Sequence, residues 1–408
     1  MTAVQKQYAL LSLPVIVGAL GYFVDIYDLL LFSIIRVKSL KSLGLSPADI
    51  KDYGALIISV QMIGMLIGGI VWGIMGDKKG RLSVLFGSII LYSLANIANG
   101  MVQNTFQYIV FRFIAGFGLA GELGAGVTLV IELVPKKRRG VATSVMAGIG
   151  LTGAVGAYFI SKLFDWRTCY YIGGVLGFML LLMRVKVFES GMFNELKKLD
   201  VKRGNFFMLI NNFNRFKKYM LSILIGLPNW FVVGILVTFS KEFGTEFKLA
   251  QPVDPSIAVM TTYVGVSIGG ILIGFISQWL QSRKKALLIF LVINIIGGII
   301  YFLQNGGSAV SMYWICALLG FSTGFWSILV TIGAEQFGTN LRATAATTIP
   351  NMVRGSLPII TLLFYTLQHR FTYVQSGMIT GVIISIITFA AALMIEETFH
   401  KDLDFHEL

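Results

Sequence analysis

The sequence predicts an all-α membrane protein with twelve transmembrane helices arranged as two six-helix halves. Three observations support this fold class. Of the 408 residues, 56% are hydrophobic and 13% are charged, and the mean hydropathy is +0.78, a composition far from that of soluble globular proteins. Apolar segments of about 20 residues, enough for one helical crossing of a bilayer, recur along the whole chain. Related motifs also return after 203 residues, almost half the chain.

Each apolar segment ends at a short charged or Pro- or Gly-containing turn. The expected spans are 8–35, 54–75, 82–101, 106–133, 141–162, 168–187, 217–240, 256–279, 286–304, 309–332, 344–368 and 372–394. A long polar interval, 188–216, divides these spans six and six. We therefore expect an N-terminal half at 1–187, a central loop, a C-terminal half at 217–395 and a tail at 396–408.

The net charge of +13 is explained by membrane topology. With the N-terminus in the cytoplasm, the cytoplasmic segments collect "DKKGR" at 77–81, "KKRR" at 136–139, "RKK" at 283–285 and a basic run from Arg184 to Lys218. The opposite loops hold only scattered lysines, which is the positive-inside pattern. The charge therefore indicates contact with lipid headgroups and no nucleic-acid partner. We expect a bacterial inner-membrane protein whose N- and C-termini are both cytoplasmic.

Cysteine and histidine give no sign of a metal or cofactor. Cys169 and Cys316 lie inside expected spans, and the three histidines lie at a helix end and in the tail. This distribution predicts neither a disulfide framework nor a metal cluster. The N-terminus has one basic residue before a long apolar span that contains acids, which is typical of a first crossing helix and not of a cleaved signal peptide.

The internal repeat is clearest in two turns. "IELVPKKRRGVATS" follows the fourth span and "GAEQFGTNLRATAAT" follows the tenth; Glu132 stands seven residues before Arg139, and Glu335 seven before Arg342. The same shift aligns "GDKKGR", after the second span, with "WLQSRK", after the eighth. The second copy keeps the basic residues but loses the acid. Such a duplication predicts parallel halves with a binding site between them near the bilayer midplane.

Five charged residues lie deep inside expected spans, where a charge costs about 2.5–3.5 kcal/mol, so each is a functional candidate. They are Asp25, Asp28, Arg112, Glu122 and Arg354. The first two are separated by three residues, so both carboxylates face one side of the first helix. Arg112 is the cation available to both in the same half. The alternative is a permanent ion pair that only fixes helix packing.

Glu122 lies ten residues after Arg112, about 80° further round the helix. It could join a proton route or bond to a neighbouring helix. The glycines around it are expected to permit close helix contact.

Arg354 is the cation of the second half for which no embedded acid is available in spans 7 to 12. Pro350, Gly355 and Pro358 predict a locally irregular helix of the kind that lines cavities. We expect Arg354 to bind a carboxylate or phosphate of a substrate, with Asn351 nearby as a hydrogen-bonding partner. The alternative is an arginine bonded to backbone carbonyls.

Polar and aromatic residues in "LPNWF" and "FSTGFW" are further candidates for substrate contact. They are Asn229, Trp230, Thr323 and Trp326. Aromatic residues in membrane helices also serve packing or interfacial anchoring, which is the alternative.

The six-plus-six layout, "GDKKGR", "RFIAGFGLAGE" and the two turns with glutamate seven residues before arginine together resemble the major facilitator superfamily along essentially the entire chain. Within it, these motifs and "FESGMF" are most similar to the metabolite:proton symporter and sugar-porter-like branches. "VDIYDLLLF" is similar to the acidic first-span motif of those branches and of phosphate and aromatic-acid symporters. The resemblance implies transport by alternating access.

The resemblance also implies roles for particular residues. In resembling symporters, a first-span acid and a fourth-span arginine form the proton-coupling pair, which assigns this role to Asp28 first and Asp25 second, with Arg112, and puts Glu122 near the proton route. A gate that latches spans 2 and 3 to a neighbouring helix is implied at Asp77, Arg81, Glu132, Arg139, Glu335 and Arg342. Loss of the acid after span 8 makes a symmetric second latch doubtful.

We therefore expect a monomeric secondary transporter that moves a small organic anion or zwitterion together with protons. A proton-driven exporter of amphipathic compounds is the alternative, against which Arg354 counts. A non-transporting sensor is a third reading, against which the gate motifs and the short tail count. No ATP-binding loop and no set of catalytic groups is present, which disfavours a primary pump and a membrane enzyme.

Overall fold

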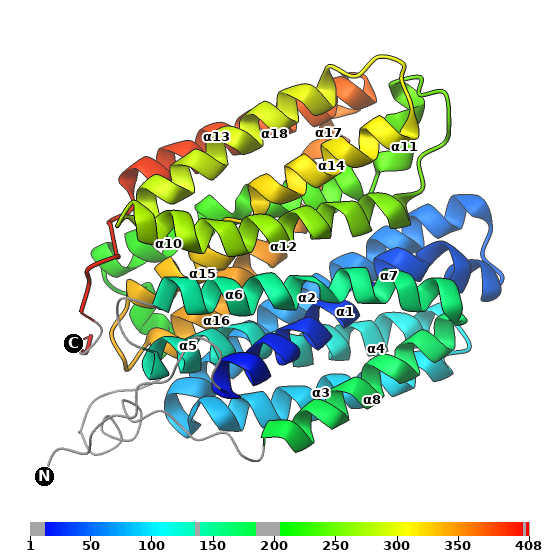
Figure 1. Cartoon of the computed structure of the whole chain (residues 1–408). Coiled ribbons are helices and arrows are strands. Elements are labelled where there is room, and N and C mark those ends of the chain that lie inside the picture. The colour runs from blue at the N-terminus through cyan, green and yellow to red at the C-terminus, as the bar shows by residue number, and fades with distance from the viewer. Residues whose placement is uncertain (1–12, 135–138, 185–204, 403–404, 408) are drawn as a thin grey trace, which may run out of the picture.

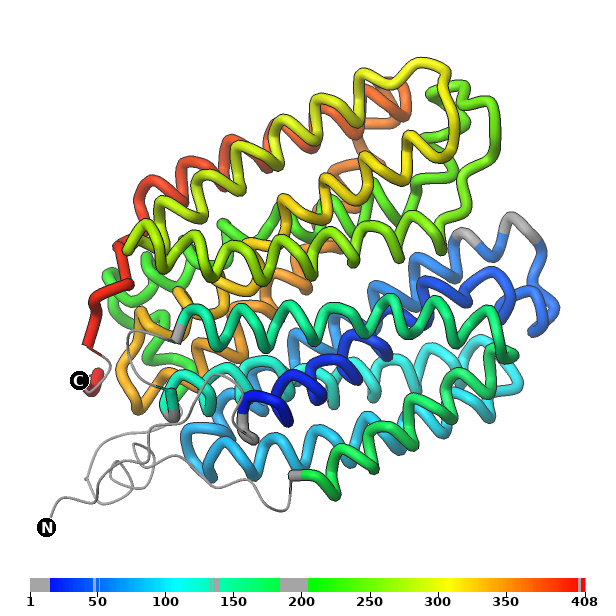
Figure 2. The backbone as a smooth tube through the Cα atoms, in the orientation of Figure 1, coloured from blue at the N-terminus to red at the C-terminus, as the bar shows by residue number. Residues whose placement is uncertain are grey.

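The computed structural model describes residues 13–134, 139–184, 205–402 and 405–407. Within these ranges the chain forms helices and their connections, without strands. Figures 1 and 2 show the helices running side by side in two bundles, the first built from the N-terminal half and the second from the C-terminal half. Large apolar side chains such as Trp279, Leu182 and Leu303 are exposed on the outside, as expected for surfaces that face lipid.

The first bundle contains six crossings. Its helices are α1 (Leu13–Ser42), α2 (Pro47–Lys79), α3 (Arg81–Met101), α4 (Thr105–Leu119), α5 (Glu122–Leu133), α6 (Arg139–Leu151), α7 (Gly153–Leu163) and α8 (Trp166–Arg184). Helices α4 and α5 together make one crossing, as do α6 and α7. Capping side chains determine where α2 and α4 begin. Ser46 accepts a hydrogen bond from the backbone N–H of Asp49, and Asn104 accepts one from the backbone N–H of Gln107.

The second bundle repeats this plan. Its elements are η2 (Phe206–Leu209), α10 (Phe213–Phe231), the π-helix η3 (Val232–Val237), α11 (Ser240–Glu246), α12 (Pro255–Trp279), α13 (Arg283–Phe302), α14 (Ala309–Thr323), α15 (Trp326–Glu335), α16 (Arg342–Gly355), α17 (Leu357–Leu367) and α18 (Tyr373–Met394). Here α14 with α15, and α16 with α17, each form one crossing.

The prediction of twelve crossings is confirmed, with corrected bounds. Eleven helical segments are long and apolar enough to span a membrane by themselves. The twelfth is α16 with α17, which is interrupted at Ser356 and whose first part is rich in threonine and charge. Helix α1 continues to Ser42, beyond the expected end at 35, so Arg36 is helical. Helix α10 begins at Phe213, inside the expected loop, and 185–204 lies outside the described residues.

The broken crossings carry the internal repeat into three dimensions. The first half breaks at Ala120 and Thr152, and the second half at Gly324 and Ser356, so equivalent breaks are 204 residues apart. At Thr152 and Ser356 the hydroxyl donates to a carbonyl three residues earlier, a bond that competes with the helical pattern. The predicted irregularity around Arg354 is confirmed. Discontinuous helices of this kind form the binding sites of many transporters.

Small residues bring the two halves into contact along two seams. At Gly124 of α5 there is no room for a β-carbon beside Thr347 of α16, and at Gly274 of α12 none beside Ser144 of α6. Membrane helices use such small residues to approach closely. The seams therefore fix which helices face the interface between the halves.

The two ends of the bundle differ in charge. One end, called the basic face below, holds the α2–α3 and α12–α13 turns, the start of α10 and the C-terminal tail, and its basic residues include Lys78, Lys79, Lys217, Lys218, Arg283, Lys284 and Lys285. The start of α1 and the end of α18 both lie on this side in Figure 1. The opposite end, called the distal face, holds the α1–α2, α7–α8 and α11–α12 connections.

Candidate functional site

Asp28 and Arg112 form a buried ion pair inside the first half. Nη1 of Arg112, on α4, donates to Oδ1 of Asp28, on α1, at 3.0 Å, and Nη2 donates to the Asp28 carbonyl at 3.2 Å. Both side chains are fully buried. The guanidinium also lies 5.6 Å from the centre of the Tyr170 ring, whose hydroxyl is hydrogen-bonded to Tyr108 at 2.7 Å. Arg112 therefore fixes both the side chain and the backbone of one turn of α1.

Asp25 lies one turn earlier on α1 but pairs with the other half. Its Oδ2 is 4.0 Å from Nη2 of Arg354, on α16, and both side chains are buried. At this distance the interaction is electrostatic and longer than a hydrogen bond. Nη1 of Arg354 donates to Oδ1 of Asn351 at 3.0 Å. One turn of α1 thus holds two ion pairs, one within its own half and one across to the other.

Two expectations about these charges were wrong. Arg112 was expected to serve both aspartates, and Arg354 was expected to have no acidic partner. Residues three apart on a helix point about 60° away from each other, enough for Asp25 and Asp28 to face different helices. The acid that neutralises Arg354 comes from span 1, and the packing of one half on the other cannot be read from spacing along the chain.

A small cavity adjoins Arg354 between the halves. Its walls are Tyr22, Ile26, Leu29, Leu151, Asn229, Trp230, Tyr263, Val266 and Trp326. Its volume of about 10 Å³ is close to the space that one water molecule needs, so an organic solute requires the halves to separate here. Nε1 of Trp326 donates to the Tyr22 hydroxyl at 3.1 Å, and its ring centre lies 5.7 Å from the Arg354 guanidinium carbon. The arrangement is a buried cation surrounded by aromatic rings.

The predicted substrate contacts divide into two groups. Asn229, Trp230 and Trp326 line this cavity beside Arg354. Thr323 does not line it, since its hydroxyl donates to the Gly320 carbonyl of its own helix. Asn351 is next to Arg354 as expected, but its amide also donates to two backbone carbonyls, at Ala120 and Thr347.

Two tyrosines of the cavity were missed from the sequence. Tyr22 lies three residues before Asp25, on nearly the same side of α1, and this spacing could have identified it. Tyr263 lies in α12, among apolar residues and glycines with no charge nearby in sequence to mark it. Only the packing of the halves brings it to Arg354.

Glu122 is buried at the first position of α5, directly after the break that follows α4. It stands ten residues beyond Arg112, roughly 15 Å along the crossing. Its position therefore separates it from the Asp28–Arg112 pair and puts it at the start of α5, a helix that contacts α16 of the second half.

At the basic face, Asp77 joins the two halves. The Asp77 carboxylate, at the end of α2, accepts hydrogen bonds from the backbone N–H groups of Ala343 and Thr344 at 3.1 and 2.8 Å, and from the Thr344 hydroxyl at 2.7 Å. These donors form the first turn of α16. A carboxylate is favoured there because it accepts from free N–H groups at the positive end of the helix dipole.

Glu132 forms the centre of a second cluster at the same face. Its Oε1 lies 2.8 Å from Nη2 of Arg81 and 3.3 Å from Nη1 of Arg342, so one carboxylate bridges an arginine of each half. Nη2 of Arg81 also lies 3.4 Å from the Thr339 carbonyl of the second half. These contacts close the bundle at the basic face. The side chain of Arg139 lies outside the described residues.

The second half has a corresponding pair despite the missing acid. Arg283, in the turn after α12, donates from Nε and Nη2 to the two oxygens of Glu335 at 2.6 and 2.8 Å. This bidentate pair corresponds to Arg81 with Glu132, with one residue of difference in the shift. The second half therefore keeps the arginine–glutamate part of the latch and lacks only a counterpart of Asp77.

The C-terminal tail also packs against the basic face. Glu397 accepts hydrogen bonds from the Ser282 hydroxyl and from the N–H groups of Arg283 and Phe399. Partial burial opposes ionisation of Glu397, but these hydrogen bonds outweigh it and hold its pKa below the ordinary value. Further along, the Thr339 N–H donates to the Phe405 carbonyl at 2.9 Å, beside the Arg81 cluster.

Comparison with known proteins decides the family. The sequence pattern of the Major Facilitator Superfamily matches residues 18–362, most of the chain. The chain belongs to the major facilitator superfamily. It is therefore a secondary transporter of small organic solutes and not an enzyme, as the sequence predicted.

Two relatives are similar to the chain in sequence, and one solved structure is similar in fold. The niacin transporter NiaP of Acinetobacter baylyi is 29% identical, with 95% of this chain and 94% of the relative covered. The gentisate transporter of Corynebacterium glutamicum is 24% identical, with 81% and 75% covered. The solved structure of the proton:xylose symporter XylE has a TM-score of 0.75 at 16% identity and covers 96% of this chain and 97% of its own. This last match concerns the fold.

The protein is closed at its basic face by the contacts of Asp77 and Glu132. A second cavity, called the distal cavity, lies toward its distal face. This cavity has a volume of about 40 Å³ and lies between α1 and α2 of the first half and α10, η3, α12 and α17 of the second. Leu29 and Trp230 belong to its walls and to those of the cavity at Arg354. The distal cavity therefore ends at the aromatic wall of the Arg354 site.

Proposed function

We propose that the protein imports a small aromatic carboxylate together with a proton, as a monomer in a bacterial inner membrane whose cytoplasm faces the basic face. The excess of basic side chains at that face supports the orientation. Two bacterial relatives are named for niacin and gentisate, both of which are ring compounds with one carboxylate. The buried Arg354 supplies a partner for a carboxylate, and the aromatic rings around it match a flat ring.

The observation that carries this proposal is the division of partners along one turn of α1. Asp28 pairs with Arg112 inside the first half, whereas Asp25 pairs with Arg354 across the interface. When rigid halves rock against each other, a pair within one half persists and a pair between halves separates. Alternation between the two states therefore changes the surroundings of the Asp25 carboxylate and leaves those of Asp28 unchanged.

Coupling follows from competition for Arg354. A substrate carboxylate that binds Arg354 takes the cation away from Asp25. A buried carboxylate without a cation favours its protonated form, so Asp25 binds a proton as substrate binds. Sequence analysis assigned the proton to Asp28 first; the geometry favours Asp25, because Asp28 keeps its cation in both states.

The test is uptake into proteoliposomes with an alkaline interior, using labelled nicotinate, benzoate and gentisate, with nicotinamide as a neutral comparison. We expect carboxylates to accumulate and Arg354→Gln to abolish uptake, whereas Arg370→Gln, which removes an exposed arginine, has no effect. Asp25→Asn should lose accumulation driven by the pH gradient but keep exchange of labelled for unlabelled substrate.

Two outcomes would count against the proposal. Accumulation driven by pH that survives Asp25→Asn would remove Asp25 from coupling. Uptake of carboxylates by Arg354→Gln at the parent's rate would remove the anion site. The export alternative predicts the opposite gradient dependence, with accumulation when the interior is acidic.

A further inference from the structure

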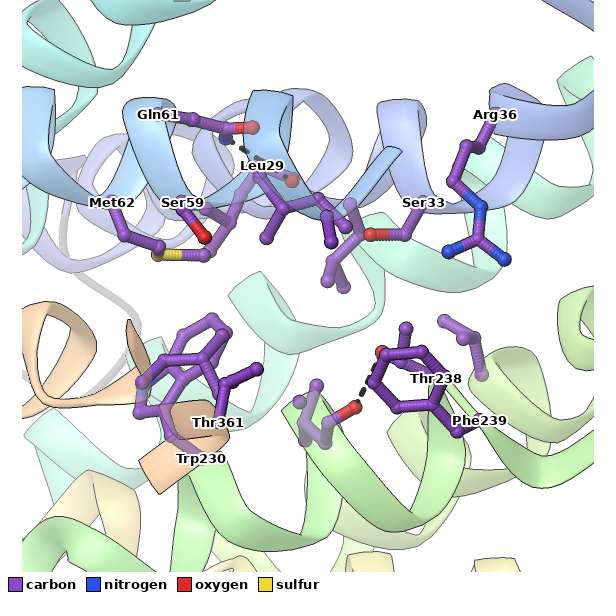
Figure 3. A pocket seen from close by; sticks show the side chains of 17 residues that line it. Leu29, Ser33, Arg36, Ser59, Gln61, Met62, Trp230, Thr238, Phe239 and Thr361 are labelled. Atoms are coloured by element: carbon purple, nitrogen blue, oxygen red, sulfur yellow. Dashed lines mark hydrogen bonds between the residues drawn. The ribbon is translucent and has the colours of Figure 1, made fainter. Parts of the chain in front are cut away.

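Among the described residues that line the distal cavity, Arg36 carries the one charged side chain. The remaining walls are apolar or carry hydroxyl and amide groups, such as those of Ser33, Ser59, Gln61 and Thr361. Figure 3 shows Arg36 at one end of the cavity with its guanidinium directed into the space between the halves. Arg36 lies eleven residues beyond Asp25 on the same helix, roughly 16 Å nearer the distal face.

Arg36 is about nine-tenths buried, yet no described residue neutralises it at close range. Its Nε is buried without a hydrogen-bond partner. Among the described residues, no hydrogen bond or ion pair within 4.0 Å engages its guanidinium. Its Nη1 and Nη2 are not among the fully buried atoms, so they open onto the cavity, where an anion can reach them.

The site around Arg36 is shaped for its side chain. Gly54 of α2 faces the Arg36 stem so closely that a β-carbon there would lie 2.5 Å from Cδ. The titratable groups near Arg36 from the opposite half are the Glu242 carboxylate of α11 and the neutral Tyr365 phenol of α17. Glu242 is therefore the acid that competes for Arg36 across the mouth of the cavity, from beyond ion-pair distance.

The cavity at Arg36 leads to the cavity at Arg354. The two share Leu29 and Trp230, which form the partition between them. A solute that arrives from the distal face meets Arg36 first, then the Trp230 ring, then Arg354. Two arginines at successive depths can pass one carboxylate inward.

We propose that Arg36 forms an outer anion subsite, which binds the carboxylate of the transported solute before it reaches Arg354. This inference rests on the proposed function, because it assigns the same substrate class to a second position on the route. Ser33, one turn before Arg36 on α1 and in the wall of the same cavity, is a reporter position for it.

The experiment measures how fast Ser33→Cys reacts with a methanethiosulfonate reagent, with nicotinate or nicotinamide added. The parent chain serves as background, because its native thiols, Cys169 and Cys316, are buried. We expect nicotinate to slow the reaction and nicotinamide to do so far less. Arg36→Gln should raise the protecting nicotinate concentration about tenfold, the effect of losing one charge-assisted contact. Arg36→Lys should keep most protection.

Controls separate the outer subsite from the inner one and from the proposed function. Lys41→Gln, which removes an exposed cation of the same helix, should leave protection unchanged. Protection should also survive Arg354→Gln, and it would do so even if uptake of carboxylates were never observed. Protection that survives Arg36→Gln, that is lost with Arg354→Gln, or that nicotinate fails to give in the parent would overturn the outer subsite.

Discussion

Asp28 and Asp25 show how one turn of a helix can hold two carboxylates that pair with arginines of different halves. Asp28 receives two bonds from Arg112, one on its side chain and one on its carbonyl. Asp25 has its cation at 4.0 Å in another half. The tighter pair orders the turn of α1, and the looser pair is free to open. We therefore assign the structural interpretation of embedded ion pairs to Asp28–Arg112 and propose the functional one for Asp25–Arg354.

A first prediction concerns the tighter pair. Asp28→Asn leaves Arg112 buried without its carboxylate, so we expect a loss of about 3–5 kcal/mol in the free energy of unfolding. The double variant Asp28→Asn, Arg112→Gln should recover most of it, because no charge stays uncompensated. Denaturant titration in detergent micelles measures both. An Asp28→Asn variant as stable as the parent would show that the pair does not stabilise the fold.

Most of the charged residues of the site, and the pairing of Asp28 with Arg112, were predicted from the sequence, but the pairing of Asp25 with Arg354 was not. The energetic cost of a charge in a membrane helix identifies Asp25, Asp28, Arg112 and Arg354 without any structure. Which acid meets which arginine depends on the packing between the halves. Arg36 was missed for another reason: the first span was expected to end at residue 35, so Arg36 was counted outside the helix.

At the scale of elements, one of the broken crossings also takes part in the contact that closes the basic face. The contact between α2 and α16 combines a carboxylate, Asp77, with the N-terminus of a helix that breaks again at Ser356. Sequence analysis predicted the repeat and the irregular helix, because proline, glycine and motif spacing are local signals. It did not predict the Arg283–Glu335 pair, because the arginine is displaced by one residue in the repeat.

A second prediction tests the Asp77 latch. Asp77→Asn keeps the size of the side chain but removes the charge that accepts from the start of α16. A hydrogen bond to a charged group contributes about 1.5 kcal/mol or more, so opening of the basic face should become about tenfold more frequent. Labelling of Ser144→Cys, buried at the α6–α12 seam, measures this opening. Unchanged labelling, or an equal effect of Asp52→Asn on the exposed start of α2, would contradict the latch.

A third prediction concerns the tail. The pKa of Glu397 is lower in the docked tail than in a free one, so the undocked tail binds more protons. Docking is therefore strongest above the ordinary carboxyl pKa and is lost as the pH falls through the lowered value. We expect proteolysis of the tail to be slow at neutral pH and to accelerate only as the pH falls below the ordinary glutamate pKa of about 4.3, and Glu397→Gln to be cut quickly throughout. A pH-independent rate in the parent would exclude this role of Glu397.

At the scale of the whole molecule, the contacts describe one state of a two-state transporter. The basic face is closed by Asp77, by the Glu132 cluster and by the docked tail. The cavity lined by Arg36 lies on the distal side, between α1 and α2 of the first half and α10, η3, α12 and α17 of the second. Arg354 lies between the closed face and this cavity, and in the proposed function its pairing with Asp25 is the interaction that substrate replaces.

The central claim is that substrate and proton bind together because the substrate carboxylate takes Arg354 from Asp25. Its most direct test is proton uptake by the purified protein in weakly buffered detergent solution, followed with a pH indicator as nicotinate is added. We expect uptake of about one proton per nicotinate bound, none with nicotinamide, and none in Asp25→Asn, while Asp52→Asn behaves like the parent. Nicotinate binding without proton uptake, or full uptake in Asp25→Asn, would contradict the claim.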